Sequence, residues 1–236
     1  MKIMKMIYDK FLFPLVKAGR ENPFSMVNAM KRISERGHII NSVIDVGASD
    51  GQWSKKFMKF YPNSEYFLIE AQKEHEKALI SLKKDKENVN HLISAAGNEV
   101  GRIYFNNEGL FGGVASKVPF KKNNIEVNMV SIDNVIEKNN LKPPYLIKLD
   151  THGFEREILE GAKKALRSTE ILIIESYAHP IGGTFRFFEL CEYMKTLGFL
   201  PIDLVDLMLR KRDNTLWQMD LFFTKDSHEK FKHNTS

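Results

Sequence analysis

From residue 39 onward, short apolar runs alternate with amphipathic segments along the chain. The apolar runs are rich in Val, Ile, Leu and Phe, which is typical of strands covered on both faces. In the amphipathic segments apolar residues recur every three or four positions, which predicts helices with one buried face. The predicted strands are 39–49, 65–71, 89–96, 145–150, 170–176, 200–206 and 217–225, and the predicted helices are 53–61, 75–84, 154–166 and 184–199.

This alternation predicts βαβ units, and therefore an α/β fold with a doubly wound, mostly parallel sheet of seven strands. One region departs from the rhythm. Residues 101–106, 113–120 and 125–131 have the pattern of short strands, with no convincing helix between them. We therefore expect an antiparallel excursion after the third parallel strand, close to the edge of the sheet where ligands bind.

The first 36 residues predict one or two amphipathic helices, followed by a single domain over residues 37–228 and a tail over 229–236. Their apolar face can dock on the core or on a partner, or lie on a membrane surface, because lysines flank it. The segment lacks the uninterrupted apolar core of a signal peptide. The apolar face comprises Ile3, Met6, Ile7, Phe11 and Leu15, and the flanking lysines are Lys2, Lys5, Lys10 and Lys17.

The composition is that of an ordinary globular protein, with 43% hydrophobic and 28% charged residues among 236. No apolar run approaches the roughly 20 residues of a membrane span. The net charge of +5 comes from dispersed lysines, so it permits polyanion binding without arguing for it. The single cysteine, Cys191, excludes an intrachain disulfide and suits a reducing cytoplasm, and we interpret it as a buried structural thiol. There is no Cys/His cluster with zinc spacing.

The stretch "VIDVGASDGQW", from Val43 to Trp53, breaks a strand with Gly47 and Gly51. Glycine lets a ligand approach the backbone closely and permits a positive φ. The stretch is neither a P-loop nor a GxGxxG fingerprint. Carboxylates beside such a turn would repel a pyrophosphate but would favour an ammonium group, as in the amino-acid moiety of S-adenosylmethionine.

A second acid should follow at the end of the next strand, where it can accept hydrogen bonds from a ribose. Glu70 in "FLIEA" lies about twenty residues past Gly51, as that rule requires, although it can also be a solvent-facing strand end. The small residues Ser94 to Gly97 end the third strand and can admit an adenine. The predicted cofactor contacts are Asp45, Gly47, Ala48, Ser49, Asp50, Gly51, Trp53, Glu70, Ala71, Ser94, Ala95 and Asp150.

Several segments together resemble the FkbM-type methyltransferases. They are "VIDVGASDGQW", "LIEA", "LIKLDTHGFEREILEGAKKAL" and the C-terminal series "IESY", "FFELCEYMKTLGF" and "QMDLFF", so the resemblance covers about residues 40 to 225. It implies a class I, Rossmann-like methyltransferase fold, S-adenosylmethionine as methyl donor, and usually O-methylation of sugars or other hydroxyl-bearing metabolites. The most specific segment is "KLDTHGFEREILEGA".

In that segment the family typically shows Lys-Ile-Asp-Val-Glu-Gly-x-Glu. Lys148, Asp150, Gly153 and Glu155 match this pattern, whereas His152 stands where the glutamate is usual. A catalytic role of that glutamate therefore cannot be transferred to this chain.

A hydroxyl acceptor is a poor nucleophile and benefits from a general base or a metal. Asp150 and Glu175 end neighbouring predicted strands, with His152 just beyond Asp150 and His179 in the loop "ESYAHPIGG". These four are the predicted catalytic residues, and His152 with a pKa near neutrality is the nearest proton acceptor. Carboxylates and imidazoles also offer ligands for a divalent cation. We nevertheless expect no metal requirement.

Each of these residues also has a structural interpretation. Asp150 can cap the helix that follows it, and both histidines can be exposed loop residues. Other charged residues fit better as surface groups or as acids in the first turn of a helix. These are Glu155, Glu157, His75, His91, Arg186 and Lys117.

The sequence therefore predicts a cytoplasmic O-methyltransferase that acts on a small-molecule or glycan acceptor. An RNA methyltransferase is the first alternative, weakened by the lack of a basic stripe with interleaved aromatic residues. A non-catalytic scaffold that recruits partners through its N-terminal helices is the second. Asp45 and Glu70 speak against it, because a scaffold has no need of cofactor-binding acids. The oligomeric state is not predicted.

Overall fold

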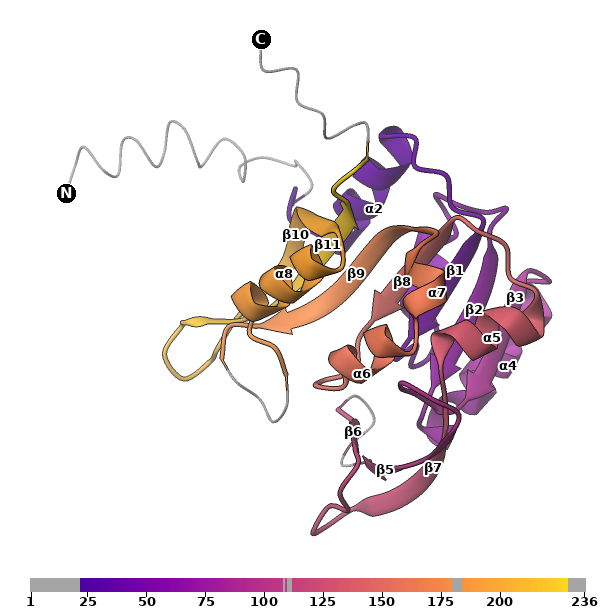
Figure 1. Ribbon diagram of the computed structural model, residues 1–236, viewed down its shortest axis with the longest axis vertical. Helices are drawn as coiled ribbons and strands as arrows, with labels where there is room; N and C mark the ends of the chain where they lie inside the picture. The colour runs from indigo at the N-terminus through magenta and orange to yellow at the C-terminus, as the bar shows by residue number, and fades with distance from the viewer. Residues whose placement is uncertain (1–21, 108, 110–111, 180–183, 229–236) are drawn as a thin grey trace.

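The computed structural model describes residues 22–107, 109, 112–179 and 184–228 (Figure 1). A seven-stranded sheet runs through it in the order β10-β11-β9-β8-β1-β2-β3. All neighbouring pairs from β9 to β3 are parallel, whereas β11 is antiparallel to both of its neighbours. The strands are β1 (Ser42–Val46), β2 (Glu65–Glu70), β3 (Val89–Ile93), β8 (Tyr145–Leu149), β9 (Thr169–Tyr177), β10 (Phe199–Leu209) and β11 (Leu216–Lys225). The expected doubly wound, mostly parallel sheet is confirmed.

Helices cover both faces of the sheet, because its central strands carry apolar side chains on both sides. In β1, Ile44 and Val46 belong to one buried cluster and Val43 to the other. The first cluster lies under α5 (Ile132–Asn139), α6 (Glu155–Glu160), α7 (Lys163–Leu166) and α8 (Phe187–Thr196), on the near face in Figure 1. The second lies under α2 (Met26–Glu35), α3 (Gln52–Phe57) and α4 (Glu76–Asp85), which follows a short 3-10 turn, Lys73–His75.

A smaller sheet, in the order β4-β7-β5-β6, lies beyond the end of the main sheet (Figure 1). Its strands are β4 (Ala95–Ala96), β5 (Gly101–Asn106), β6 (Val114–Ser116) and β7 (Asn124–Val130). The antiparallel pairs β5–β6 and β5–β7 are the expected excursion. The continuous strand expected over 89–96 is wrong, because the chain leaves the main sheet at Ser94 and β4 pairs in parallel with β7. The hydroxyl of Ser94 donates to the carbonyl oxygen of Asn128 in the smaller sheet at 2.9 Å.

Two helical features differ from the expectation. Helix α5 was not expected, although Ser131 accepts from the amide of Asn134 as its N-cap and Asn140 ends it in the left-handed region. The helix expected over 154–166 is divided at Gly161 and Ala162 into α6 and α7. A Cβ at Gly161 would lie 2.1 Å from the carbonyl oxygen of Gly97, so close packing against the strand-end loop requires glycine there.

Helix α2 is the described part of the segment that was assigned to the N-terminal extension, and it docks on the core. Met26, Ala29, Met30 and Ile33 are buried in the second cluster. Arg32 forms a bidentate ion pair with Asp203 of β10, at 2.7 and 2.9 Å. The expected membrane-facing or partner-facing surface of residues 3–15 lies outside the described residues, as does the tail 229–236. Within the described part of the chain, no helix is long and apolar enough to cross a membrane.

Candidate active site

The turn after β1 has the left-handed backbone conformation for which glycine is suited. Gly47 and Gly51 have φ of +75° and +78°, and Ser49 between them has +49°. The amide of Gly47 donates to the carbonyl oxygen of Ile69 at 2.9 Å, which fixes the turn against the end of β2. The turn therefore lies beyond the carboxyl ends of β1 and β2, where open α/β sheets bind their ligands.

Packing explains why position 47 is glycine. A Cβ there would lie 2.0 Å from the carbonyl oxygen of Asp150, at the end of β8. A side chain at this position would therefore meet the main chain, and the expected close approach of a ligand to the turn is a second reason for glycine. At Gly51 an added Cβ would lie 2.7 Å from Leu82, the end of a flexible side chain.

We expect Gly47→Ala to lower the free energy of unfolding by at least about 2 kcal/mol. A left-handed φ costs a non-glycine residue roughly 1–2 kcal/mol, and the clash with Asp150 adds overpacking strain. Urea unfolding measures the loss. The control is Gly101→Ala, because a Cβ at Gly101 has nothing within 4 Å. Equal stability of the two variants would contradict the role given to Gly47.

A cavity of about 400 Å³ opens above the carboxyl ends of β1, β2, β8 and β9. Nine of the predicted site residues line it: Gly47, Ser49, Glu70, Ala71, Ser94, Ala95, Asp150, His152 and Glu175. The smaller sheet contributes Phe105, Gly113 and Ala115 to its wall. The hydroxyl oxygen of Ser49 is buried there and has no hydrogen-bond partner within the described residues, so it is available to a ligand. The residues present therefore fit a bound cofactor.

Five predicted cofactor residues lie outside the cavity wall. Ala48 is buried in the second core cluster, and Gly51 is the N-cap of α3. Asp50 accepts a hydrogen bond from the amide of Gln52 at 3.2 Å. Trp53 stacks on Phe57, with ring centroids 5.1 Å apart. The fifth, Asp45, is fully buried below the cavity. We interpret these residues as support for the turn.

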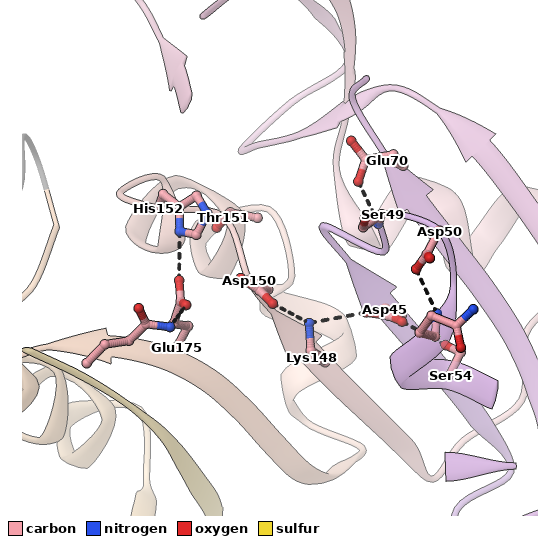
Figure 2. Close-up of polar contacts among 12 residues, drawn as sticks. Asp45, Ser49, Asp50, Ser54, Glu70, Lys148, Asp150, Thr151, His152 and Glu175 are labelled. Atoms are coloured by element: carbon pink, nitrogen blue, oxygen red, sulfur yellow. Dashed lines mark hydrogen bonds and ion pairs between the residues drawn. The ribbon is translucent and has the colours of Figure 1, made fainter. Parts of the chain in front are cut away.

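Glu70 holds two loops of the cavity in place. Its Oε2 accepts from the amide of Ser49 and its Oε1 from the amide of Gln72, both at 2.7 Å (Figure 2 shows the first). Each carboxylate oxygen can accept a further hydrogen bond, so the group remains able to bind ribose hydroxyls. The carboxylate therefore has a structural role in addition to the expected cofactor contact.

We expect Glu70→Ala to weaken S-adenosylmethionine binding roughly 10- to 100-fold, because it removes charge-assisted hydrogen bonds worth about 1.5–3 kcal/mol. Some stability should also be lost, since two loop amides lose their acceptor. Calorimetric titration measures the affinity. Glu65→Ala, at the exposed start of the same strand, is the control. Unchanged affinity in Glu70→Ala would remove Glu70 from the cofactor site.

A buried lysine of β8, Lys148, links this strand to its neighbour β1. The Nζ of Lys148 donates to Oδ2 of Asp150 at 2.9 Å and lies 3.6 Å from Oδ1 of Asp45, whose other oxygen accepts from Ser54 (Figure 2). Burial alone would lower the pKa of Lys148, but the two carboxylates raise it above its ordinary value. Burial alone would raise the pKa of Asp150, but Lys148 holds it below its ordinary value. Both groups are therefore charged at neutral pH.

Asp150 does not cap the helix that follows. Its carboxylate is held by Lys148, and the N-cap of α6 is Phe154, without a side-chain hydrogen bond. The loop 151–153 is instead fixed by Glu155, whose Oε1 accepts from the amide of Gly153 at 2.7 Å. Asp150 thus remains a wall residue of the cavity.

His152 faces two side chains of β9. Its Nδ1 lies 2.7 Å from Oε2 of Glu175 and 2.8 Å from the hydroxyl of Tyr177, which itself donates to Glu175 at 2.6 Å. Gln218 of β11 donates to the other oxygen of Glu175. The hydrogen bond to Glu175 raises the pKa of His152 to about 9. The pKa of His152 therefore lies above the near-neutral value that was expected, and its role as a base stays a prediction.

We expect His152→Gln to destabilise the protein by roughly 2–3 kcal/mol at pH 6 and much less at pH 10. The folded pKa of about 9 lies above the ordinary 6.5, so the stabilisation is complete below about 6.5 and is lost as the pH rises through about 9. Urea unfolding at several pH values measures it. In the control His91→Gln the low-pH loss should be absent, because burial lowers the pKa of His91. An equal loss at both pH values would exclude a charged pair.

The structure does not bring His179 to the cavity. Its Nε2 lies 3.5 Å from the hydroxyl of Thr215, and its ring is 6.3 Å from that of Trp217. His75, in contrast, was expected at the surface, but it is buried in the wall of the cavity. Lys117 pairs with Glu157 at 3.6 Å, and Arg186 pairs with Glu189, so both have the surface roles considered for them.

A second recess of about 580 Å³ adjoins the cavity and is strongly acidic. It shares Asp150, Glu175, Met208 and Gln218 with the cavity. Its remaining lining is Asn22, Phe24, Asp206, Leu207 and Asp220. Burial raises the pKa of Asp220 to about 7. Asp220 and Gln218 were not predicted as site residues, although both lie in the segment "QMDLFF" that resembles the family, because the apolar run around them predicts only a buried strand.

Asp150, His152 and Glu175 also offer one ligand atom each within 4.8 Å of one another. Carboxylate and imidazole ligands suit several divalent ions. Here, however, Asp150 is bound to the Lys148 ammonium, and a proton on His152 faces Glu175. An ion would have to displace both. Independence of an added metal therefore stays a prediction.

The chain is similar to known methyltransferases in sequence and in fold. The family model "Methyltransferase FkbM domain" matches residues 45–201. An FkbM methyltransferase from Methylobacillus flagellatus KT superimposes with a TM-score of 0.52 at 20% identity, covering 78% of this chain and 43% of that one. A precorrin-6y C5,15-methyltransferase from Geobacter metallireducens GS-15 has a TM-score of 0.46 at 13% identity, with coverages of 84% and 86%. A SAM-dependent methyltransferase from Aquifex aeolicus has 0.45 at 12%, with coverages of 91% and 97%.

No curated relative matches the sequence. The chain spans less than half the length of the solved FkbM methyltransferase. The family model nevertheless matches well over half of the chain, and its range includes the glycine turn, Glu70 and the segment from Lys148 to Glu155. The protein therefore belongs to the FkbM family of S-adenosylmethionine-dependent methyltransferases.

Proposed function

We propose that the protein transfers a methyl group from S-adenosylmethionine in the cavity to a hydroxyl group of an acceptor in the adjoining recess. The observation that carries the proposal is the shared wall of the two spaces, formed by Asp150, Glu175, Met208 and Gln218. Methyl transfer is an in-line displacement, so donor and acceptor must meet at one point with little between them. When bound, the cofactor supplies an electrophilic methyl group on a sulfonium.

The lining of the recess supports an uncharged, hydroxyl-rich acceptor such as a sugar, a glycan or a related metabolite. Carboxylates accept hydrogen bonds from hydroxyl groups and repel phosphates. Asp150, Glu175, Asp206 and Asp220 all line the recess, and Phe24 offers an apolar surface for a ring face. The same acids disfavour RNA, whose affinity for proteins depends on phosphate contacts.

We assign the general base to Asp220. A catalytic group works best with a pKa near the working pH, and the pKa of Asp220 is about 7. Lys148 keeps Asp150 ionised but weakly basic, and His152 already carries its proton. Asp220 would take the hydroxyl proton as the acceptor oxygen bonds to the methyl carbon, and the bond between that carbon and the sulfur would break to leave S-adenosylhomocysteine. His152, held by Glu175, would place a positive charge beside the shared wall.

A cytoplasmic location is part of the same proposal. Cys191 is a free, half-buried thiol whose pKa is raised by burial, which suits a structural residue in a reducing compartment. Contact of residues 1–21 with a membrane surface stays a prediction.

The test is an acceptor screen with isotope-labelled S-adenosylmethionine. The panel contains neutral sugars, amino sugars, sugar phosphates, lipid-linked sugars and transfer RNA, and the readouts are methylated product and S-adenosylhomocysteine. We expect neutral sugars to be methylated and the phosphorylated forms to react more slowly. Methylation of RNA alone would overturn the assignment of the recess.

A further inference from the structure

At the amino ends of the strands, on the edge of the sheet opposite to the cavity, two histidines and a glutamate meet. Nδ1 of His38 lies 2.6 Å from Oε1 of Glu170, and Nε2 of His228 lies 2.8 Å from the same oxygen. His38 precedes β1, Glu170 is the second residue of β9, and His228 follows β11. The three residues belong to segments that are far apart in the sequence, so the tertiary fold alone brings them together.

We propose that His38, Glu170 and His228 form a structural site for a transition-metal ion of the zinc class. Two imidazole nitrogens and one carboxylate oxygen are typical ligands for such an ion. The three ligand atoms lie within 4.8 Å of one another. The side chains of Glu170 and His228 are 23% and 17% exposed, so solvent can supply the fourth ligand, whereas the side chain of His38 is 1% exposed.

Only a small movement separates the present geometry from a coordinated one. Around a tetrahedral ion with bonds of about 2.0–2.1 Å, ligand atoms lie about 3.3 Å apart. The two contacts of 2.6 and 2.8 Å must therefore open by roughly half an ångström, which a rotation of the partly exposed Glu170 carboxylate can supply. On binding, the ion takes the place of any hydrogen between these imidazole nitrogens and the carboxylate, because a metal binds the unprotonated nitrogen.

The electrostatics differ from those of the acid–histidine cluster in the active site. There the Lys148 ammonium lies 2.9 Å from Asp150 and already supplies a positive charge. Among the described residues, only the two histidines form ion pairs with Glu170. Within the part of the chain that the structure describes, no lysine or arginine therefore occupies the place beside Glu170 where a metal ion would bind.

The proposal does not depend on the catalytic assignment. Glu170 and Glu175 lie near opposite ends of β9, about 17 Å apart at the usual rise of a strand. An ion at Glu170 would join the start of the domain to the segment after its last strand. Its effect should therefore be on stability and not on the chemical step.

The experiment uses the full-length protein without a histidine tag, freed of metal by chelator and dialysis. Zinc chloride is titrated by calorimetry, and cobalt chloride is titrated by visible absorption. We expect one ion per chain, the absorption bands of tetrahedral cobalt, and a melting temperature that rises with the free zinc concentration. His228→Gln and Glu170→Gln should each weaken this binding at least 100-fold, whereas His179→Gln and His152→Gln should leave it unchanged.

Three results would overturn the proposal: no ion bound at 100 µM metal, binding that survives both His228→Gln and Glu170→Gln, or binding that His152→Gln removes. Should Glu170→Gln fail to fold by circular dichroism, His228→Gln decides alone. This substitution removes no buried apolar group, and His228 lies outside the strands, so the variant should fold.

Discussion

Asp220→Asn is expected to slow methyl transfer by roughly 10²- to 10⁴-fold while leaving cofactor binding intact. General-base catalysis contributes on that order, and asparagine cannot take a proton. Asp220 lines only the acceptor recess, so the cofactor cavity should keep its shape. Single-turnover rates at saturating cofactor, measured from pH 5.5 to 9, test this. In the wild type the rate should rise through about pH 7, and the variant should lose that rise.

The same variant should be more stable than the wild type at pH 8. The folded pKa of Asp220 is about 7 and its ordinary value is 3.8, so its neutral form favours the folded state. That advantage is complete below about 3.8 and is lost as the pH rises through about 7. Asparagine removes the cost of the buried charge, which we expect to amount to roughly 2 kcal/mol at pH 8 and to be small at about pH 4.

Asp226→Asn is the matched control, because Asp226 is an exposed residue just beyond the carboxyl end of β11. It should change neither the rate nor the stability. A rate for Asp220→Asn within a few-fold of the wild type, or a reduction without change in the pH profile, would transfer the role of base to another residue of the recess.

Lys148→Met is expected to lower the free energy of unfolding by about 3–5 kcal/mol. Removing one partner of a buried ion pair leaves an uncompensated charge, and here two carboxylates would lose the same ammonium. Urea unfolding at pH 7 measures the loss. It should shrink at acid pH, because burial raises the pKa of Asp45 and that group can become neutral there.

A second substitution separates charge from packing. Adding Asp45→Asn to Lys148→Met removes one of the two stranded carboxylates and should recover part of the stability. Lys55→Met, at an exposed position of α3, is the control for the loss of a lysine. A loss below about 1 kcal/mol in Lys148→Met would mean that solvent reaches the two acids.

The main sheet was predictable because its signal is local. Runs such as 171–174 are apolar at successive positions, and the amphipathic segments between the runs have the helical period. The change of sheet at Ser94 was not predictable, because the run 89–96 continues without a break while the hydrogen bonds change partner. Pairing between sheets depends on residues 129–130, which lie more than thirty positions later in the sequence.

Part of the candidate site was also predictable from the sequence. Gly47 and Glu70 were expected from the geometry of a strand–turn–helix unit, and the structure places both in the cavity wall. The roles of Asp220 and Gln218 could not be predicted, because only the position of β11 beside β9 brings them to Glu175 and the recess. The raised pKa of His152 could not be predicted from the sequence either, because it depends on a hydrogen bond to Glu175, which lies 23 positions later in the chain.

The position of β11 has a consequence for how the chain reaches this structure. It is the last strand of the described sequence, yet it lies inside the sheet between β9 and β10. Strand β10 therefore has no neighbour in the main sheet until residues 216–225 have been synthesised, and the ion pair between Arg32 of α2 and Asp203 of β10 forms only when β10 is in place. During translation the half built from β1, β2, β3 and β8 can form first. The acceptor recess is completed only after β11, which contributes Gln218 and Asp220 to its lining, has left the ribosome.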